Sequence, residues 1–284
     1  MEFEKWQALG NDYVIVEAAD LPFELTPARI KSICAAHTGV SADGILLLSE
    51  PDDPSYVARL RIFNPDGSEA ELSGNGAREA VMYLRRHDWT DSDSFAIQTA
   101  AGDIRPRITS ATECTVDMGR ATVTSSSYPS GTETGRGELT AAGRTWSFQF
   151  VQAGNPQTSI RAENEDDLEQ LDLQAIGPEI ENNELFPNRT NVSWFAELGP
   201  GRIRARIFER GVGETSASGT GATGAAVAYV LDGGRSPVTV VLDGGELTVE
   251  VSEPDLQIKL TGWAVPVFRG ALADTFLEEL HATK

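Results

Sequence analysis

One short segment occurs twice in this chain and constrains its fold more than any other feature. Ser-Gly-Asn-Gly-Ala at 73–77 returns as Ser-Gly-Thr-Gly-Ala at 218–222, and each copy runs into small and apolar residues that favour a helix. The same spacing brings Glu69 onto Glu214, so the likeness extends beyond the glycines. The repeat therefore predicts two similar halves, each with the same kind of helix start.

A second repeated pattern, in the same order along the chain, supports the division into two similar halves. Residues 148–155 repeat the strand-like pattern of residues 3–11 with one residue dropped, and both end in Gly-Asn. With 284 residues the chain is long enough for two domains of ordinary size. We predict an N-terminal half over 1–118, completed by 268–284, and a C-terminal half over 119–267. The stretch 125–137, rich in Ser, Thr, Gly and Pro, is typical of a loop near the junction.

The coarse pattern mixes strands and helices. Helical spacing covers 27–36, and the first motif predicts a helix over 77–86. An acidic run at 163–173 indicates either a helix start or a solvated connection. The strand-like runs lie at 3–7, 13–16, 44–48, 57–63, 203–208, 238–242 and 247–251, and a final apolar piece at 264–268 is expected to return to the first half.

The charge balance excludes some partners. The net charge is −20, with 43 acidic residues against 23 basic ones, and such a surface repels phosphate backbones and anionic lipid. We therefore expect neither nucleic-acid nor membrane partners. Only four lysines are present, and an acidic, lysine-poor surface is typical of halophilic proteins, in which salt screens the self-repulsion. An ordinary acidic cytoplasmic enzyme is the alternative.

Neither a leader nor a metal site is indicated. No basic start precedes an apolar run, and no stretch approaches the roughly 20 apolar residues of a membrane span, which favours a cytoplasmic protein. Two cysteines, Cys34 and Cys114, form no disulfide framework. Three histidines without ligand spacing argue against zinc, so no metal is expected.

The repeated motif suits an anion. Glycines at a helix start let backbone N–H groups converge, and the helix dipole adds positive potential there. Each copy is therefore a candidate cradle for a carboxylate or a phosphate. The simpler interpretation is that Ser73 and Ser218 are helix N-caps, a role that serine fills well.

Several asparagines stand at predicted turns and strand ends. Taken singly, each is more often a turn residue than a ligand contact. Together with an expected ion pair between Glu209 and Arg210, they resemble a site for a substrate with both ammonium and carboxylate groups. The amides are Asn11, Asn64, Asn75, Asn155 and Asn191.

Four stretches, at 3–12, 64–78, 154–156 and 209–221, together resemble the diaminopimelate epimerase family, and the likeness spans nearly the whole chain. The resemblance implies an α/β (α+β) fold of two pseudo-symmetric domains, each a sheet wrapped around a central helix. It also implies a cofactor-independent isomerase, a homodimer that interconverts LL- and meso-diaminopimelate in lysine biosynthesis. The substrate-binding residues implied are Asn11, Asn64, Gly74, Asn75, Asn155, Asn191, Arg210, Gly219 and Thr220, with Glu209 beside the catalytic pair.

The chain departs from that family at the reacting groups. The family has a cysteine at each motif head, where this chain has Ser73 and Ser218, and a histidine where this chain has Gln157. If a serine hydroxyl ionises roughly five pKa units above a thiol, forming the base costs about 7 kcal/mol more, or about five decades in rate. Gln157 argues against the serines being introduced substitutions, since a designer has no reason to change a third position.

Three functions remain open from the residues. The chain is an epimerase in which Ser73 and Ser218 are assisted by Glu209, or in which Glu209 is itself the base. Alternatively, it is a carboxylate-dependent isomerase of the phenazine-biosynthesis type, with Glu209, Glu69 or Asp43 as base. The third function is a catalytically silent amino-acid-binding homologue.

Overall fold

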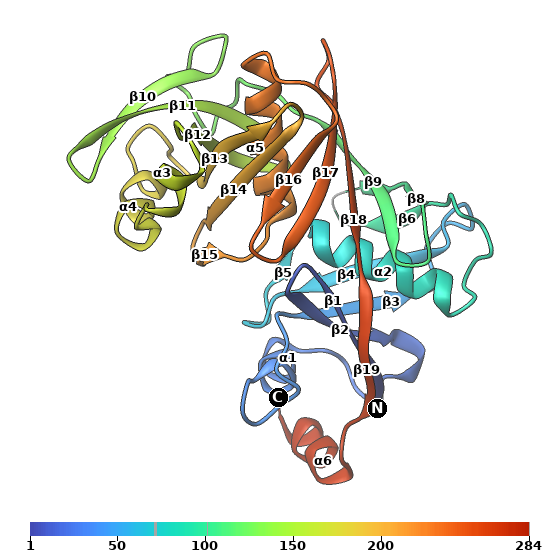
Figure 1. Ribbon diagram of the computed structural model, residues 1–284. Helices are drawn as coiled ribbons and strands as arrows, with labels where there is room; N and C mark the ends of the chain where they lie inside the picture. The colour runs from blue at the N-terminus through green and yellow to red at the C-terminus, as the bar shows by residue number, and fades with distance from the viewer. Residues whose placement is uncertain (71–72, 101, 284) are drawn as a thin grey trace. The chain divides into compact units, whose positions relative to one another are not determined.

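The computed structural model describes residues 1–70, 73–100 and 102–283, and it divides the chain into two compact units (Figure 1). One unit contains Met1–Val116 and Gly262–Lys284, and the other Asp117–Thr261. Glu71 and Leu72, which belong to the second family-like stretch, lie outside the described residues.

The first unit is built on a sheet with the strand order β19-β1-β2-β3-β4-β6-β7, and β5 pairs with β4. β19 pairs antiparallel with β1, so the end of the chain returns to its beginning, as the apolar run at 264–268 predicted. The strands are β1 (Glu2–Ala8), β2 (Asn11–Glu17), β3 (Ile45–Ser49), β4 (Ala58–Phe63), β5 (Glu69–Ala70), β6 (Ile97–Thr99), β7 (Gly102–Ile104) and β19 (Val265–Ala271). A hairpin of β8 (Pro106–Ile108) and β9 (Glu113–Arg120) leads to the unit boundary.

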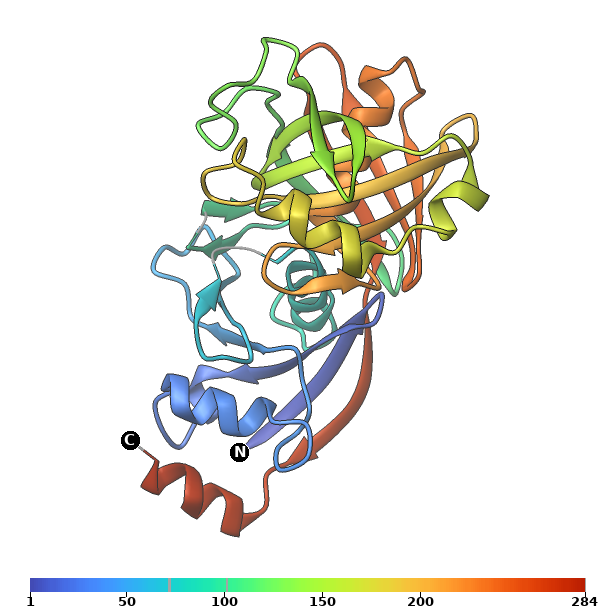
Figure 2. The same cartoon turned by 90° about the vertical axis from the view of Figure 1, so that its left-hand side faces the viewer.

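The helices of the first unit occupy two kinds of position. α2 (Gly74–Arg86) is buried from Gly74 to Leu84 and contacts β1, β2, β3 and β19. α1 (Pro27–Cys34) and α6 (Asp274–Ala282) lie together beside the chain ends (Figure 2). Arg29 joins them, because its Nε donates to the carbonyl of Leu280 over 2.8 Å. A short 3-10 helix, Ala18–Asp20, follows β2.

The second unit repeats this plan with a larger sheet, in the order β10-β11-β12-β13-β14-β16-β17-β18, with β15 paired to β14. The strands are β10 (Arg136–Ala141), β11 (Arg144–Ala153), β12 (Asn155–Arg161), β13 (Asn191–Gly199), β14 (Arg202–Glu209), β15 (Gly213–Thr215), β16 (Val238–Leu242), β17 (Gly245–Ser252) and β18 (Gln257–Trp263). The helices are α3 (Glu165–Glu169), α4 (Leu173–Glu181) and α5 (Gly219–Leu231). The acidic run at 163–173 thus contains a short helix.

α5 is the central helix of the second unit. It carries no charged residue, is buried almost throughout, and contacts β11 to β14, β16 and β17. A Cβ atom at Gly224 would lie 2.7 Å from the Cβ of Gln157, so a glycine is needed for the helix to approach β12 this closely. Each unit is therefore a sheet around a central helix, and the α/β fold expected from the sequence is confirmed.

The repeated Gly-Asn pairs and the repeated serine motifs correspond to matched local structures. The Gly-Asn pairs stand between β1 and β2 and between β11 and β12, and both glycines adopt positive φ, 85° at Gly10 and 77° at Gly154. Such an angle strains other residues, which explains glycine at both turns. The helix after the first motif begins at Gly74, three residues before the expected start.

Candidate active site

Ser73 caps the first central helix. Its Oγ accepts a hydrogen bond from the N–H of Gly76 over 3.1 Å, as an N-cap serine does. The N–H groups of the first turn of a helix lack partners within it, so Gly74 and Asn75 place backbone donors next to the serine hydroxyl. A carboxylate bound here would meet both these donors and the positive end of the helix dipole.

A chain of hydrogen bonds fixes the amides around this helix start. Arg78 Nη2 donates to Asn75 Oδ1 (2.6 Å), Asn75 Nδ2 donates to Asn11 Oδ1 (3.3 Å), and Asn11 Nδ2 donates to Asp43 Oδ2 (2.7 Å). Two of the expected binding residues, Asn11 and Asn75, are thus in contact. Each amide retains a second N–H for a ligand.

The middle of this helix holds two buried ionisable residues, Arg78 and Glu79, each with 0% exposure. Burial lowers the pKa of Arg78 to about 10, which still leaves it cationic at neutral pH. Burial raises the pKa of the Glu79 carboxyl well above its ordinary value, which favours the neutral form. The positive charge of Arg78 beneath the helix start therefore adds to the attraction for an anion.

Asn64 lies in the turn that follows β4. Its Nδ2 donates to Ser68 Oγ over 2.9 Å, and Ser68 Oγ donates to Asp66 Oδ1 over 2.6 Å. The structure therefore shows Asn64 in a turn-stabilising role, and its part in substrate binding stays a prediction.

Ser218 caps the second central helix in the same way. Its Oγ accepts from the N–H of Gly221 over 3.2 Å, and the residue is 5% exposed. Thr223 Oγ1 donates to the carbonyl of Gly219 over 2.8 Å, matching the bond of 3.0 Å from Arg78 Nη1 to the carbonyl of Gly74. The two helix starts share their capping geometry, but only the first has a cation beneath it.

Glu209 is the carboxylate next to Ser218. It ends β14, where Thr215 Oγ1 donates to its Oε1 over 2.9 Å. Burial raises the pKa of Glu209, and hydrogen bonds from Thr215 and Ser218 partly offset this rise. A half-buried carboxylate beside a serine hydroxyl is placed to take up a proton from it.

The expected ion pair between Glu209 and Arg210 is not present. Arg210 Nη1 instead donates to the carbonyl of Asn188 over 2.9 Å, whereas Glu209 contacts hydroxyls. Neighbouring residues at the end of a strand point to opposite faces, which separates the two side chains. That prediction was wrong because adjacency in the sequence does not bring side chains together in a strand.

Amide side chains also form hydrogen bonds among the expected binding residues of the second unit. Asn191 Oδ1 accepts from the N–H of Arg210 (2.9 Å), and its Nδ2 donates to the carbonyl of Pro156 (3.0 Å), so Asn191 joins the turn after β14 to β12. Gln157 Nε2 donates to Asn155 Oδ1 over 2.5 Å. Asn155, Asn191 and Gln157 are therefore close to one another, and Gln157 occupies the position at which the family has a histidine.

Two corresponding ion pairs, one in each unit, were not predicted from the sequence. Arg61 contacts Glu69 with two bonds of 2.9 and 2.8 Å, and Arg206 contacts Glu214 with two bonds of 2.9 and 2.7 Å. The repeat that aligns the two glutamates also aligns the two arginines, so the signal was available. Both carboxylates are occupied by arginine, which makes Glu69 a poor candidate for a base.

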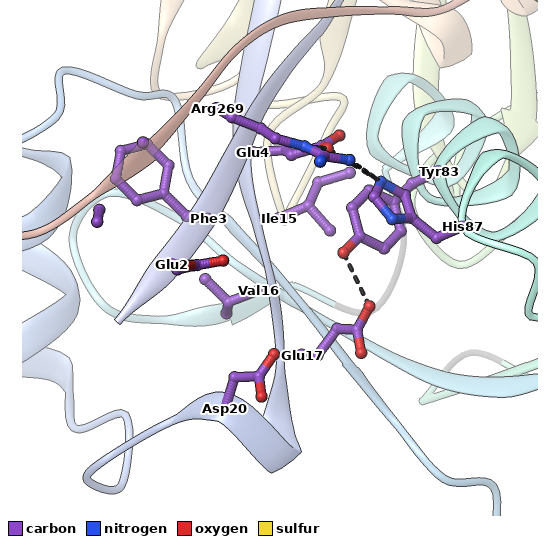
Figure 3. Close-up of a pocket in the computed structure, with 12 residues that line it drawn as sticks. Glu2, Phe3, Glu4, Ile15, Val16, Glu17, Asp20, Tyr83, His87 and Arg269 are labelled. Carbon is purple, nitrogen blue, oxygen red and sulfur yellow. Dashed lines mark hydrogen bonds and ion pairs between the residues drawn. The ribbon is translucent and has the colours of Figure 1, made fainter.

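A cavity of about 410 Å³ in the first unit contains none of these groups. Figure 3 shows Arg269 reaching across Glu4 towards His87, and the Tyr83 hydroxyl directed at Glu17. Glu4 Oε1 lies 3.0 Å from His87 Nε2, and Tyr83 Oη donates to Glu17 over 2.8 Å. These side chains satisfy one another, so we assign this cavity no part in the site.

The described part of the chain shows neither a metal-binding cluster nor a membrane-spanning helix. Among residues 1–70, 73–100 and 102–283, no group of three or more His, Cys, Asp or Glu side chains is arranged to hold a metal ion. Over the same residues, no helix is long and apolar enough to cross a membrane.

Comparison with known proteins gives a consistent result. The family model described as diaminopimelate epimerase matches residues 3–124 and 150–266. A diaminopimelate epimerase of Synechococcus sp. (strain JA-3-3Ab) is 38% identical, covering 96% of this chain and 99% of its own, and that of Thioalkalivibrio sulfidiphilus is 35% identical with the same coverage.

Solved structures share the fold at low identity. A phenazine biosynthesis protein of the PhzF family from Bacillus anthracis aligns with a TM-score of 0.72 at 17% identity, covering 96% of this chain and 99% of that one. A probable proline racemase from Agrobacterium radiobacter aligns with a TM-score of 0.69 at 14% identity, covering 96% and 93%. At these identities the likeness shows the fold alone.

Proposed function

The chain belongs to the diaminopimelate epimerase family, and on this premise we propose that it binds diaminopimelate and slowly interconverts the LL and meso isomers without a cofactor. Epimerisation of an amino acid requires removal of the α-proton and its return to the opposite face. The family's reaction serves lysine biosynthesis. We assign the two compact units as the two epimerase halves.

The position of the Glu209 carboxylate, held by Thr215 beside Ser218, carries this proposal. A serine alone is a poor base, since its hydroxyl ionises roughly five pKa units above a thiol. A carboxylate beside the hydroxyl can take up its proton, which makes Ser218 a usable base, though a much weaker one than a thiolate. The matched caps at Ser73 and Ser218, together with Asn11, Asn75, Asn155 and Asn191, support an amino-acid ligand.

The substrate-binding set is assigned as follows. The backbone donors at both helix starts would hold carboxylate groups, and the amides would hold the amino group and the remaining carboxylate oxygens. Asn191 would act chiefly by holding the loop of Arg210. The proposed binding residues are Asn11, Asn64, Gly74, Asn75, Asn155, Asn191, Arg210, Gly219 and Thr220.

Proton exchange tests this function directly. Purified protein is incubated with LL-diaminopimelate in D2O at low and at high KCl, exchange at the α-carbon is followed by NMR, and binding is measured by calorimetry. We expect binding, together with exchange about five decades slower than a thiol pair would give. Ser218→Ala should abolish the exchange, and Ser252→Ala, an exposed serine of β17, should not change it.

The outcomes separate the alternatives. Binding without exchange at any salt concentration would exclude the epimerase and leave the amino-acid-binding homologue. Absence of binding would exclude both. Exchange of a different small acid, with no effect of diaminopimelate, would favour the carboxylate-dependent isomerase.

We propose that the protein acts in the cytoplasm of a cell with high internal salt. The net charge of −20 gives strong self-repulsion, which salt screens over a few ångströms at molar concentration. High KCl should therefore increase both the exchange rate and the stability of the fold. A protein equally stable without salt would contradict the halophilic assignment.

We propose further that the protein is a homodimer formed through β19. β19 is the end strand of its sheet, and it exposes Val267 (53%) and Phe268 (46%). Exposed apolar side chains on an edge strand favour association with a second copy. Phe268→Asp should halve the mass measured by light scattering, while Val212→Asp, an exposed apolar residue of the other unit, should leave it unchanged. A monomeric mass for the unchanged protein would refute the assignment.

A further inference from the structure

The second unit contains a cavity of about 460 Å³ beside the C-terminal end of α5. Ala228 lies ten residues beyond Ser218, which is roughly 15 Å along the helix axis. The described residues that line the cavity include none of the proposed catalytic or binding residues, so the cavity is separate from the candidate active site. Its lining includes Arg136, Ser159, Arg161, Phe195, Ala228 and Asp232.

This cavity corresponds to the cavity of about 410 Å³ in the first unit. Each lies at the C-terminal end of a central helix, and the repeats that align the serine motifs and the Gly-Asn pairs also align residues of the two linings. The aligned pairs are Ile15 with Ser159, Glu17 with Arg161, Tyr83 with Ala228 and His87 with Asp232. The two cavities are therefore the same place in the two repeats, lined by different side chains.

A phenol occupies this place in the first unit. The Tyr83 ring stacks on His87 with ring centroids 4.1 Å apart, and its Oη donates to Glu17 over 2.8 Å (Figure 3). In the second unit Ala228 contributes only a methyl group, and Arg161 stands where the first unit has the carboxylate. Because that carboxylate accepts and a guanidinium can only donate, an occupant of the second cavity must supply the acceptor.

A buried hydroxyl in the lining of the second cavity lacks a partner. Ser159 is 1% exposed, and within residues 1–70, 73–100 and 102–283 its Oγ has no hydrogen-bond partner. A Cβ atom at Gly224, one helical turn before Ala228, would lie 3.3 Å from this Oγ, so the hydroxyl lies on the side of the sheet that faces α5. An unpaired buried hydroxyl costs free energy, which a ligand with a polar group at this point recovers.

Two exposed arginines supply donors at the same cavity. Arg136 Nη2 donates to Asp232 Oδ1 over 2.6 Å, and Arg161 Nη2 donates to Glu197 Oε2 over 2.7 Å. Asp232 Oδ2 is 3.9 Å from Arg161 Nη1, which is beyond hydrogen-bond distance. A guanidinium has five N–H donors, so Arg161 can bind a further acceptor without releasing its carboxylate partner.

We propose that this cavity binds a small organic anion: a carboxylate on a phenol-sized ring, with a second polar group opposite the carboxylate. The ring packs against Phe195 and Ala228, and the carboxylate accepts from Arg161. Ser159 and Arg161 are two residues apart on β12, roughly 7 Å along the strand, a distance that a para-substituted benzene ring spans. The second polar group therefore reaches the unpaired Ser159 hydroxyl. This site does not depend on the proposed epimerase function.

Titration with 4-hydroxybenzoate tests the site. The full chain is labelled with 13C at the alanine methyl groups and the serine Cβ atoms, and NMR follows the resonances of Ala228 and Ser159. We expect a saturable shift of both and none at Ala222, at the other end of α5. Arg161→Gln should weaken binding by about 10- to 100-fold, the usual loss of a charge-assisted hydrogen bond. Arg120→Gln, an exposed arginine of the same unit, should leave it unchanged.

Two further comparisons test the position of the ligand. Benzoate lacks the hydroxyl and should bind more weakly than 4-hydroxybenzoate, and Ser159→Ala should remove this difference. Ala228→Tyr should abolish binding, because its ring takes the place of the ligand; if that variant does not fold, the Ser159→Ala comparison still decides.

The proposal is overturned if Ala228 and Ser159 show no saturable shift, if Arg161→Gln binds as well as the unchanged protein, or if the two benzoates still differ in Ser159→Ala. Added LL-diaminopimelate should not displace the 4-hydroxybenzoate, and displacement would place this ligand in the substrate site instead. A protein that binds 4-hydroxybenzoate as expected but not diaminopimelate would refute the proposed function and keep this site.

Discussion

Replacing both motif serines by cysteine is expected to raise the rate of α-proton exchange by about four to five decades. Thiols ionise roughly five pKa units below hydroxyls, which lowers the cost of forming the base by about 7 kcal/mol. Both positions are helix N-caps, and a helix N-terminus lowers the pKa of a thiol further. The fold around the motifs needs no other change, because Ser→Cys alters one atom at each site.

Exchange of LL-diaminopimelate in D2O measures this gain in the Ser73→Cys/Ser218→Cys variant. Each single variant should gain much less, because a proton must be both removed and returned. Ser252→Cys controls for the mere presence of an added thiol. Adding Gln157→His should increase the rate further, since it supplies the imidazole that the family has there. A double variant no faster than the unchanged protein would mean that the site has lost more than its thiols.

Replacing Glu209 by glutamine is expected to lower the exchange rate of the unchanged protein by about 10²–10⁴-fold, the usual contribution of a general base. The amide keeps the size of the side chain and can still accept from Thr215, but it cannot take up a proton. Glu214→Gln is the matched control, because Glu214 is a carboxylate of the same unit occupied by Arg206. It should cost stability rather than catalysis.

The pH dependence provides a second readout for Glu209. Burial raises its pKa above the ordinary value of 4.5, and the base must be ionised, so activity should fall as the pH drops through this raised pKa. The acidic limb of the profile should vanish in Glu209→Gln. An unchanged limb in that variant would show that another group is the base.

Glu209 also opposes folding when it is ionised. Because its folded pKa lies above the unfolded one, the native state binds more protons between the two values. Its contribution to the free energy of unfolding therefore falls as the pH rises through this window. Function and stability place opposite demands on this carboxylate, as is common for groups at active sites.

The sequence predicted the features that depend on local chemistry. Paired glycines after Ser73 and Ser218 identified both central helices, and the Gly-Asn pairs identified the turns with positive φ. The first helix was expected three residues late, because glycine and asparagine usually disfavour helices. Here capping by Ser73 and tertiary packing outweigh that preference.

Features that depend on long-range contacts were missed. Tyr13 stands in an apolar strand and resembles a core residue until the fold brings it to Ser73, 60 positions away along the chain. The burial of Arg78 and Glu79 was equally hidden, since charged residues next to each other in a helix usually indicate a solvated face. The repeat aligns Arg61 and Glu69 with the corresponding pair of the second unit. That the two side chains meet could be recognised only by knowing that their strands are adjacent.

The return of β19 to β1 has a consequence for how the protein is made. β1 is synthesised long before β19, one of its two partner strands, which begins only after residue 264. The unit at 117–261 is complete before then and can fold first, reversing the usual order of N-terminal before C-terminal folding during synthesis. Until the last segment emerges, one side of β1 has no neighbour, and this nascent edge is where a chaperone would have most to protect.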